Sequence, residues 1–222
     1  MVKTFDTQVR AQQHLLRVVP QGYYWWTSGV VLPERKDALA EKFADLYGTT
    51  LGKDRRYVRK SKGLANAEAV CVVDGSVYRW FLVVTDGEGV VHDSEKLKDA
   101  RTSSGRIRWA DDYVLQDSRR PTTRGGGNHW SWWLTPEAES MISRYVDRLA
   151  KSNPSEMATY VEFQLRRPLH SGVRTQMGRI LRRAKKLHAH HFPTQPWPCV
   201  EPDELPFISG FRAAQCTSGK AG

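Results

Sequence analysis

Two segments of the sequence concentrate Lys and Arg in a way that suits contact with a phosphate backbone. Between residues 163 and 200 there are eight basic residues and no Asp or Glu, and between residues 53 and 62 there are six basic residues and one acid. Localised positive charge of this kind is typical of proteins that bind a polyanion, usually nucleic acid. We predict nucleic-acid contacts at Arg55, Arg56, Arg59, Lys60, Lys62, Arg174, Arg179, Arg182, Arg183, Lys185 and Lys186.

The positive charge is local rather than spread over the chain. The 222 residues include 34 Lys and Arg and 24 Asp and Glu, which leaves a formal net charge of +10. The two basic segments carry +8 and +5, more than the whole chain, so the rest of the molecule is slightly acidic. A field that is focused in this way favours a binding surface over a merely solvated one.

The basic segment at residues 163–200 has the period of an amphipathic helix over residues 173–187. Its apolar residues recur at helical spacing and would dock on a core, which leaves the basic residues on the other faces. From Arg174 to Lys186 such a helix extends roughly 18 Å, long enough to run beside several phosphates. The apolar residues are Val173, Met177, Ile180, Leu181, Ala184 and Leu187.

Aromatic residues are frequent in the expected strands and suggest a surface on which unpaired bases stack. Neighbouring rings in a strand face opposite sides of the sheet, so one side of each pair is exposed unless another element covers it. Rings beside Lys and Arg suit single-stranded nucleic acid. The candidates for base stacking are Tyr57, Trp25, Trp80 and Trp132.

A weaker pattern indicates metal-dependent chemistry. Asp86 and Glu88 follow an apolar strand, where paired carboxylates can hold Mg²⁺. His188, His190 and His191 resemble a metal-binding His cluster and, with Cys199, offer ligands that zinc accepts. If the protein is an enzyme, these residues predict a Mg²⁺ or Zn²⁺ cofactor. Neither nucleotide-binding glycine motif, G-x-x-x-x-G-K-[ST] or G-x-G-x-x-G, is present.

Strong local signals define several elements. Residues 67–73 and 77–85 are rich in β-branched residues and flank Asp74-Gly75-Ser76, which predicts a β-hairpin. Further strands are expected over 23–31 and 129–134. Thr135-Pro136-Glu137 has the capping hydroxyl, proline and acid of a helix start.

The order of these elements predicts an α+β fold with an antiparallel or mixed sheet, packed helices and a helical, basic C-terminal portion. We expect a sheet domain over 1–134, a helical portion over 135–191 packed on it, and a Pro-rich extended tail over 192–222. The sheet domain would contain a basic loop at about 49–66, since that stretch has no clear apolar period.

We therefore predict a binding protein rather than an enzyme, without a cofactor and with RNA or single-stranded DNA as its partner. The alternatives are a metal-dependent nuclease or strand-transfer enzyme, and a subunit of a ribonucleoprotein or defence assembly. A cytoplasmic location is expected, because the sequence shows no signal peptide and no membrane-spanning apolar run. Cys71, Cys199 and Cys216 form no C-x-x-C pair, which argues against a disulfide framework.

Overall fold

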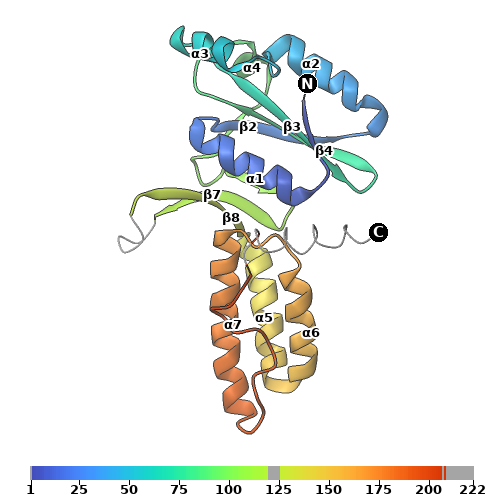
Figure 1. Cartoon of the computed structure of the whole chain (residues 1–222), viewed down its shortest axis with the longest axis vertical. Coiled ribbons are helices and arrows are strands. Elements are labelled where there is room, and N and C mark those ends of the chain that lie inside the picture. Colours follow the sequence, from blue (N-terminus) through green and yellow to red (C-terminus); the bar gives the residue numbers. More distant parts are fainter. Residues whose placement is uncertain (1, 120–125, 207, 209–222) are drawn as a thin grey trace, which may run out of the picture. The chain divides into compact units, whose positions relative to one another are not determined.

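The structure is a computed structural model that describes residues 2–119, 126–206 and 208 (Figure 1). The chain divides into two compact units. Unit 1 comprises Met1–Ile107 and Leu115–Trp130, and unit 2 comprises Arg108–Val114 and Ser131–Gly222. The described residues form seven α-helices, a five-stranded mixed sheet and a three-stranded antiparallel sheet, which confirms the predicted α+β fold.

Unit 1 is built on the five-stranded sheet, in the order β1-β3-β4-β2-β5. β1 is parallel to β3 and the other neighbours are antiparallel. The predicted hairpin is present, with Asp74 opposite Val77 and Gly75 in the left-handed region that its turn requires. The strands are β1 (Lys3–Phe5), β2 (Trp25–Val31), β3 (Ala67–Asp74), β4 (Val77–Val84) and β5 (Lys98–Asp99).

Helices cover both faces of this sheet. Alternation along β3 places Ala67, Ala69 and Cys71 on one face, where they pack with Phe43 and Tyr47 of α2. The opposite face of β3 lies against α1 (Figure 1). The helices of unit 1 are α1 (Gln8–Val18), α2 (Lys36–Tyr47), α3 (Lys53–Ser61) and α4 (Val90–Ser94), with short 3₁₀ turns at Val19–Gln21 and Pro33–Arg35.

The expected loop at 49–66 contains a helix, so that prediction needs correction. Residues 53–61 form α3, although none of its side chains is buried. Lys and Arg are good helix formers, and this helix is fastened by hydrogen bonds instead of an apolar stripe. The guanidinium of Arg56 donates to the carbonyls of Thr49 and Leu51, and that of Arg59 donates to the carbonyl of Ala65. An apolar period could not reveal a helix held in this way.

Unit 2 is mainly helical. Thr135 caps α5 as predicted, since its hydroxyl accepts from the Ala138 backbone N–H and proline occupies the first turn. In its core the apolar stripe of α7 packs against α5, which also packs against α6. The helices are α5 (Pro136–Ser152), α6 (Pro154–Leu165) and α7 (Ser171–His191). The strands of the smaller sheet contribute residues to each unit: β6 (Ile107–Trp109), β7 (Tyr113–Arg119) and β8 (Asn128–Leu134).

Of the predicted tail over 192–222, the structure describes 192–206 and 208, and the other positions lie outside the described residues. Within the described part of the chain, every helix is too short or too polar to cross a bilayer.

A buried histidine should make unit 2 sensitive to acid. His170 is 5% exposed beside Trp132, and burial lowers its pKa to about 4. The unfolded chain, in which a His pKa is 6.5, binds this proton more readily than the folded protein, so stability is lost as the pH falls from 6.5 towards 4. The shift corresponds to about 3 kcal/mol.

We expect the free energy of unfolding, measured by urea titration at pH 7 and pH 4.5, to depend less on pH in His170→Phe than in the native protein. His191→Gln, at an exposed position, is the control and should retain the native pH dependence. Equal pH dependence in all three proteins would contradict the assignment to His170.

Candidate functional site

A group of four exposed cations lies on α3 and at its C-cap. The side chains of Lys53, Arg55, Lys60 and Lys62 are all exposed, and the structure, over the residues that it describes, shows none of them in an ion pair. Tyr57 lies on the same helix and is 74% exposed. We call these five side chains the α3 surface.

The spacing of these residues arranges them in two rows along the helix. Lys53, Tyr57 and Lys60 stand at positions i, i+4 and i+7 and so share one side of α3. Arg55 and Lys62 are seven residues apart and share another side. Each row places two cations roughly 10 Å apart along the axis. The Tyr57 ring therefore has one cation on the turn before it and one on the turn after it, whereas Arg55 and Lys62 extend the positive charge to the opposite side of the helix.

The inward side of α3 holds the helix in place. Arg56 donates to Oε2 of Glu68 at 2.8 Å and to the Tyr23 hydroxyl at 2.9 Å, in addition to its two carbonyl contacts. Arg59 donates from Nη2 and Nε to the Ala65 carbonyl, at 2.8 and 3.2 Å. Both residues were predicted to contact nucleic acid. These contacts within unit 1 hold α3 in place, and they occupy donors that the prediction assigned to phosphate.

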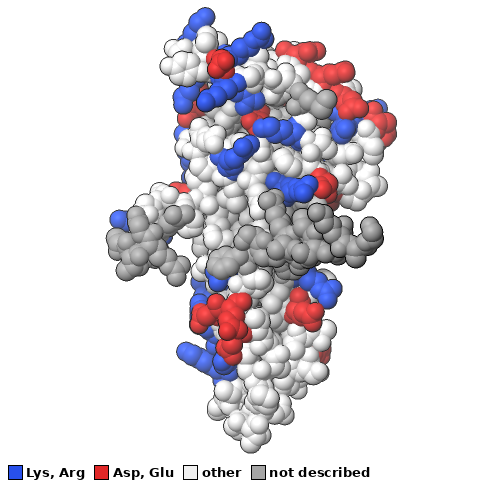
Figure 2. Space-filling model, viewed as in Figure 1, with Lys and Arg blue, Asp and Glu red and all other residues white. Residues whose placement is uncertain are grey.

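Unit 1 is also electrically polarised. In Figure 2, Lys and Arg side chains gather over α3, whereas Asp and Glu side chains gather over α2. The sequence agrees in sign: α2 and the turn before it contain four acids and three basic residues, a net charge of −1, whereas residues 53–62 carry +5. A polyanion approaching unit 1 would therefore be steered towards α3.

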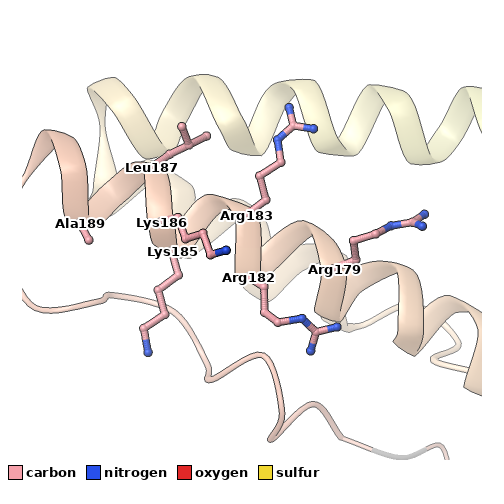
Figure 3. A pocket seen from close by; sticks show the side chains of 7 residues that line it. All are labelled: Arg179, Arg182, Arg183, Lys185, Lys186, Leu187 and Ala189. Atoms are coloured by element: carbon pink, nitrogen blue, oxygen red, sulfur yellow. The ribbon is translucent and has the colours of Figure 1, made fainter.

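The second predicted basic surface comes together in unit 2, as Figure 3 shows. An open hollow of about 790 Å³ lies along α7, and five of the six predicted cations of this helix line it. We call these five residues the basic face of α7. They are Arg179, Arg182, Arg183, Lys185 and Lys186.

Most of the basic face of α7 is neutralised by the protein's own carboxylates, which is a correction to the predicted cationic ridge. α5 supplies Glu139 to Arg179 and Asp147 to Arg183, and Figure 2 shows red beside blue along α7. A segment after α7 supplies the partners of two more cations: Arg182 lies 3.0 Å from Asp203, and Lys185 lies 2.7 Å from Glu201. The sixth predicted cation, Arg174, donates to the Leu205 carbonyl at 2.9 Å. Within the described residues, Lys186 forms no ion pair.

Among the predicted stacking residues, Tyr57 alone has a largely exposed ring. Trp132 is fully buried. Trp80 is half-buried over Gly29 and against the Phe43 ring. Trp25 is half-buried, and its indole N–H donates to Asp86 at 2.7 Å. These tryptophans are used in packing, so stacking on the strands is not supported by their placement.

The predicted metal ligands do not converge. Asp86 accepts from Trp25 and from the guanidinium of Arg101, which is also paired with Asp99, and no contact joins Asp86 to Glu88 in the described structure. Over residues 2–119, 126–206 and 208, no three His, Cys, Asp or Glu side chains are placed to hold a metal ion. A nuclease mechanism stays an untested prediction.

The three histidines separate because of helical geometry. His188 is 2% exposed and packs against the rings of Phe192 and Trp197, at 5.5 and 5.6 Å. His190 and His191 are exposed, and their rings contact each other at 5.0 Å. Residues two apart on a helix point in nearly opposite directions, so His188 and His190 cannot share a ligand.

The α3 surface includes one residue, Lys53, that was not predicted. It belongs to the same basic run, but a loop offers no reason to group residues four apart. Recognising the helix would have paired Lys53 with Tyr57 by spacing alone.

Comparison with models of protein families, with curated proteins and with solved structures found no match to this chain. Its function is therefore inferred from the charge and geometry of the sites themselves.

Proposed function

We propose that the protein binds nucleic acid through the α3 surface, with RNA or single-stranded DNA as its ligand. The observation that carries the proposal is the set of four exposed cations on α3 and its C-cap, together with the exposed ring of Tyr57. None of these cations is paired with a carboxylate in the described structure. Cations contact the phosphates, and the ring stacks on an unpaired base. The binding requires no cofactor.

The preference for a single strand follows from the ring. A base can stack on Tyr57 only when its face is free, which is not so inside a duplex. The nine residues of α3 extend roughly 13 Å, so the site spans a few nucleotides. The contact of Arg56 with Glu68 holds the helix, which carries the ring, against the rest of unit 1.

The first test is the salt dependence of binding. We expect a fluorescein-labelled 20-nucleotide oligo(dT) or oligo(U) to bind at low salt, with affinity falling as NaCl is raised. Four phosphate contacts predict a slope of about −3 in a plot of log affinity against log salt. Fluorescence anisotropy measures this. Absence of binding at low salt, or an affinity that does not change with NaCl concentration, would overturn the proposal.

The contribution of the ring can be isolated at Tyr57. Tyr57→Ala is expected to weaken binding of the single strand by about 5- to 100-fold, the usual value of one stacked base, whereas Tyr57→Phe should bind like the native protein. Duplex of the same length should bind both variants equally. Because Tyr57 is 74% exposed, the thermal midpoint should not change. Equal single-strand affinity of the Ala and Phe variants would show that stacking plays no part.

A further inference from the structure

Residues 192–206 run along α7 and bring two carboxylates to its basic face. In Figure 3 the side chains of Arg182 and Lys185 point towards this segment, which lies beside the helix. Arg182 reaches Oδ1 of Asp203 at 3.0 Å, and Lys185 contacts both carboxylate oxygens of Glu201, at 2.7 and 2.8 Å.

The segment is docked on the helix at several points besides these ion pairs. Leu205 is 2% exposed, and its carbonyl accepts from Arg174. Pro202 is buried, and its carbonyl comes so close to Gly178 that a Cβ there would lie 3.3 Å away. A helix position without a side chain thus allows the backbone of the segment to approach. The acids are therefore held over the helix by packing, not only by their own charge.

We propose that Glu201 and Asp203 cover a second nucleic-acid-binding surface, formed by Arg182, Lys185 and Lys186. The inference rests on the proposed function, because it assumes the same class of ligand. Without the two acids, three cations within one turn of α7 would have no carboxylate partner in the described structure. A phosphate chain has the same charge as the segment and would compete with it for these donors.

The two ion pairs that hold Glu201 and Asp203 on α7 are weak enough for a nucleic acid to displace them. Side-chain exposure is 54% for Arg182 and 88% for Asp203, and it is 44% and 46% for Lys185 and Glu201. Ion pairs this exposed are worth about 0–1 kcal/mol each, because water and salt screen them. A ligand that presents several phosphates at once can exceed that, so the segment weakens binding without abolishing it.

The test compares two acids of one segment that differ only in their contacts. Glu201→Gln removes the partner of Lys185, whereas Glu204→Gln removes an exposed carboxylate with no ion pair in the described structure. Both variants change the net charge equally. We expect Glu201→Gln to raise the affinity for labelled oligo(dT) by about threefold at low salt, and Glu201→Gln/Asp203→Asn by about tenfold. Glu204→Gln should change it by less than about twofold. Equal effects of Glu201→Gln and Glu204→Gln would overturn the inference.

Two further variants separate this inference from the proposed function. Adding Arg182→Gln and Lys185→Gln to the double variant should remove the gain in affinity, and persistence of the gain would also overturn the cover. The gain is measured again in a protein whose four α3 cations are replaced by Gln. If the proposed α3 site is wrong, the protein with the four α3 substitutions binds the oligonucleotide as tightly as the native protein. That outcome does not depend on the effect of the Glu201 and Asp203 substitutions.

Discussion

Replacing Lys53, Arg55, Lys60 and Lys62 with Gln is expected to reduce the affinity for a single-stranded oligonucleotide by about two to three orders of magnitude at 0.1 M salt. Each of these cations is exposed and has no ion pair in the described structure, so each is available to a phosphate. Loss of four phosphate contacts should also reduce the steepness of the salt dependence by about 3 in the log–log plot. Fluorescence anisotropy over a range of NaCl concentrations measures both quantities.

The control for this variant removes the same charge from another surface. Arg144, Arg148, Lys151 and Arg166 are exposed basic residues of α5 and the end of α6, and their replacement by Gln lowers the net charge equally. Affinity should then fall by less than about threefold, because these residues are not part of the proposed site and salt screens exposed charges that do not contact the ligand. If both quadruple variants lose the same affinity, net charge rather than the α3 surface accounts for binding.

Glu68→Gln is expected to destabilise the protein by about 3–5 kcal/mol, because it removes the only negative charge from a partly buried cluster of basic side chains in the described structure. Glu68 is 5% exposed and accepts from Lys3 at 2.7 Å, from Arg56 at 2.8 Å and from His14. Burial raises the pKa of Glu68, but the hydrogen bonds from His14, Lys3 and Arg56 outweigh it and hold the pKa well below its usual range. Without the carboxylate, these donors lose their compensating charge.

Urea unfolding followed by circular dichroism tests this prediction, and Asp74→Asn is its matched control. Asp74 lies on the same strand and pairs with Arg79, but it is exposed, so its loss should cost less than about 1 kcal/mol. Because the folded-state pKa of Glu68 is depressed, its contribution is present above pH 4.5 and is lost as the pH falls below that value. Similar destabilisation by the two substitutions would contradict a special role for Glu68.

The two predictions are linked through Arg56. This residue joins α3 to Glu68 and to two carbonyls, so weakening the cluster should loosen the helix that carries the α3 surface. Glu68→Gln should therefore also lower the affinity for nucleic acid, although Glu68 itself is buried. A variant that is destabilised as expected but binds normally would show that the α3 surface forms without this anchor.

Features that depend on residues close together in the chain could be predicted from the sequence. Three such predictions are confirmed: the Asp74-Gly75 turn, the start of α5 at Thr135 and Pro136, and the amphipathic period of α7. Turns, caps and helical faces depend on residues only a few positions apart. The location of the two basic segments was equally evident, since it is a matter of composition.

Which of these basic side chains remain free to contact a ligand depends on the tertiary structure. Arg183 and Arg179 find their carboxylates 36 and 40 residues away, on α5, and Arg56 finds Glu68 on a strand beyond the end of its helix. α3 is held in place by contacts of its arginines with acceptors outside the helix, from Thr49 to Glu68, and not by an apolar stripe. Coulomb attraction depends on distance in space, and chain folding brings together charges that the linear order keeps apart. For this reason the basic face of α7 is largely neutralised, while the shorter basic segment retains its charge.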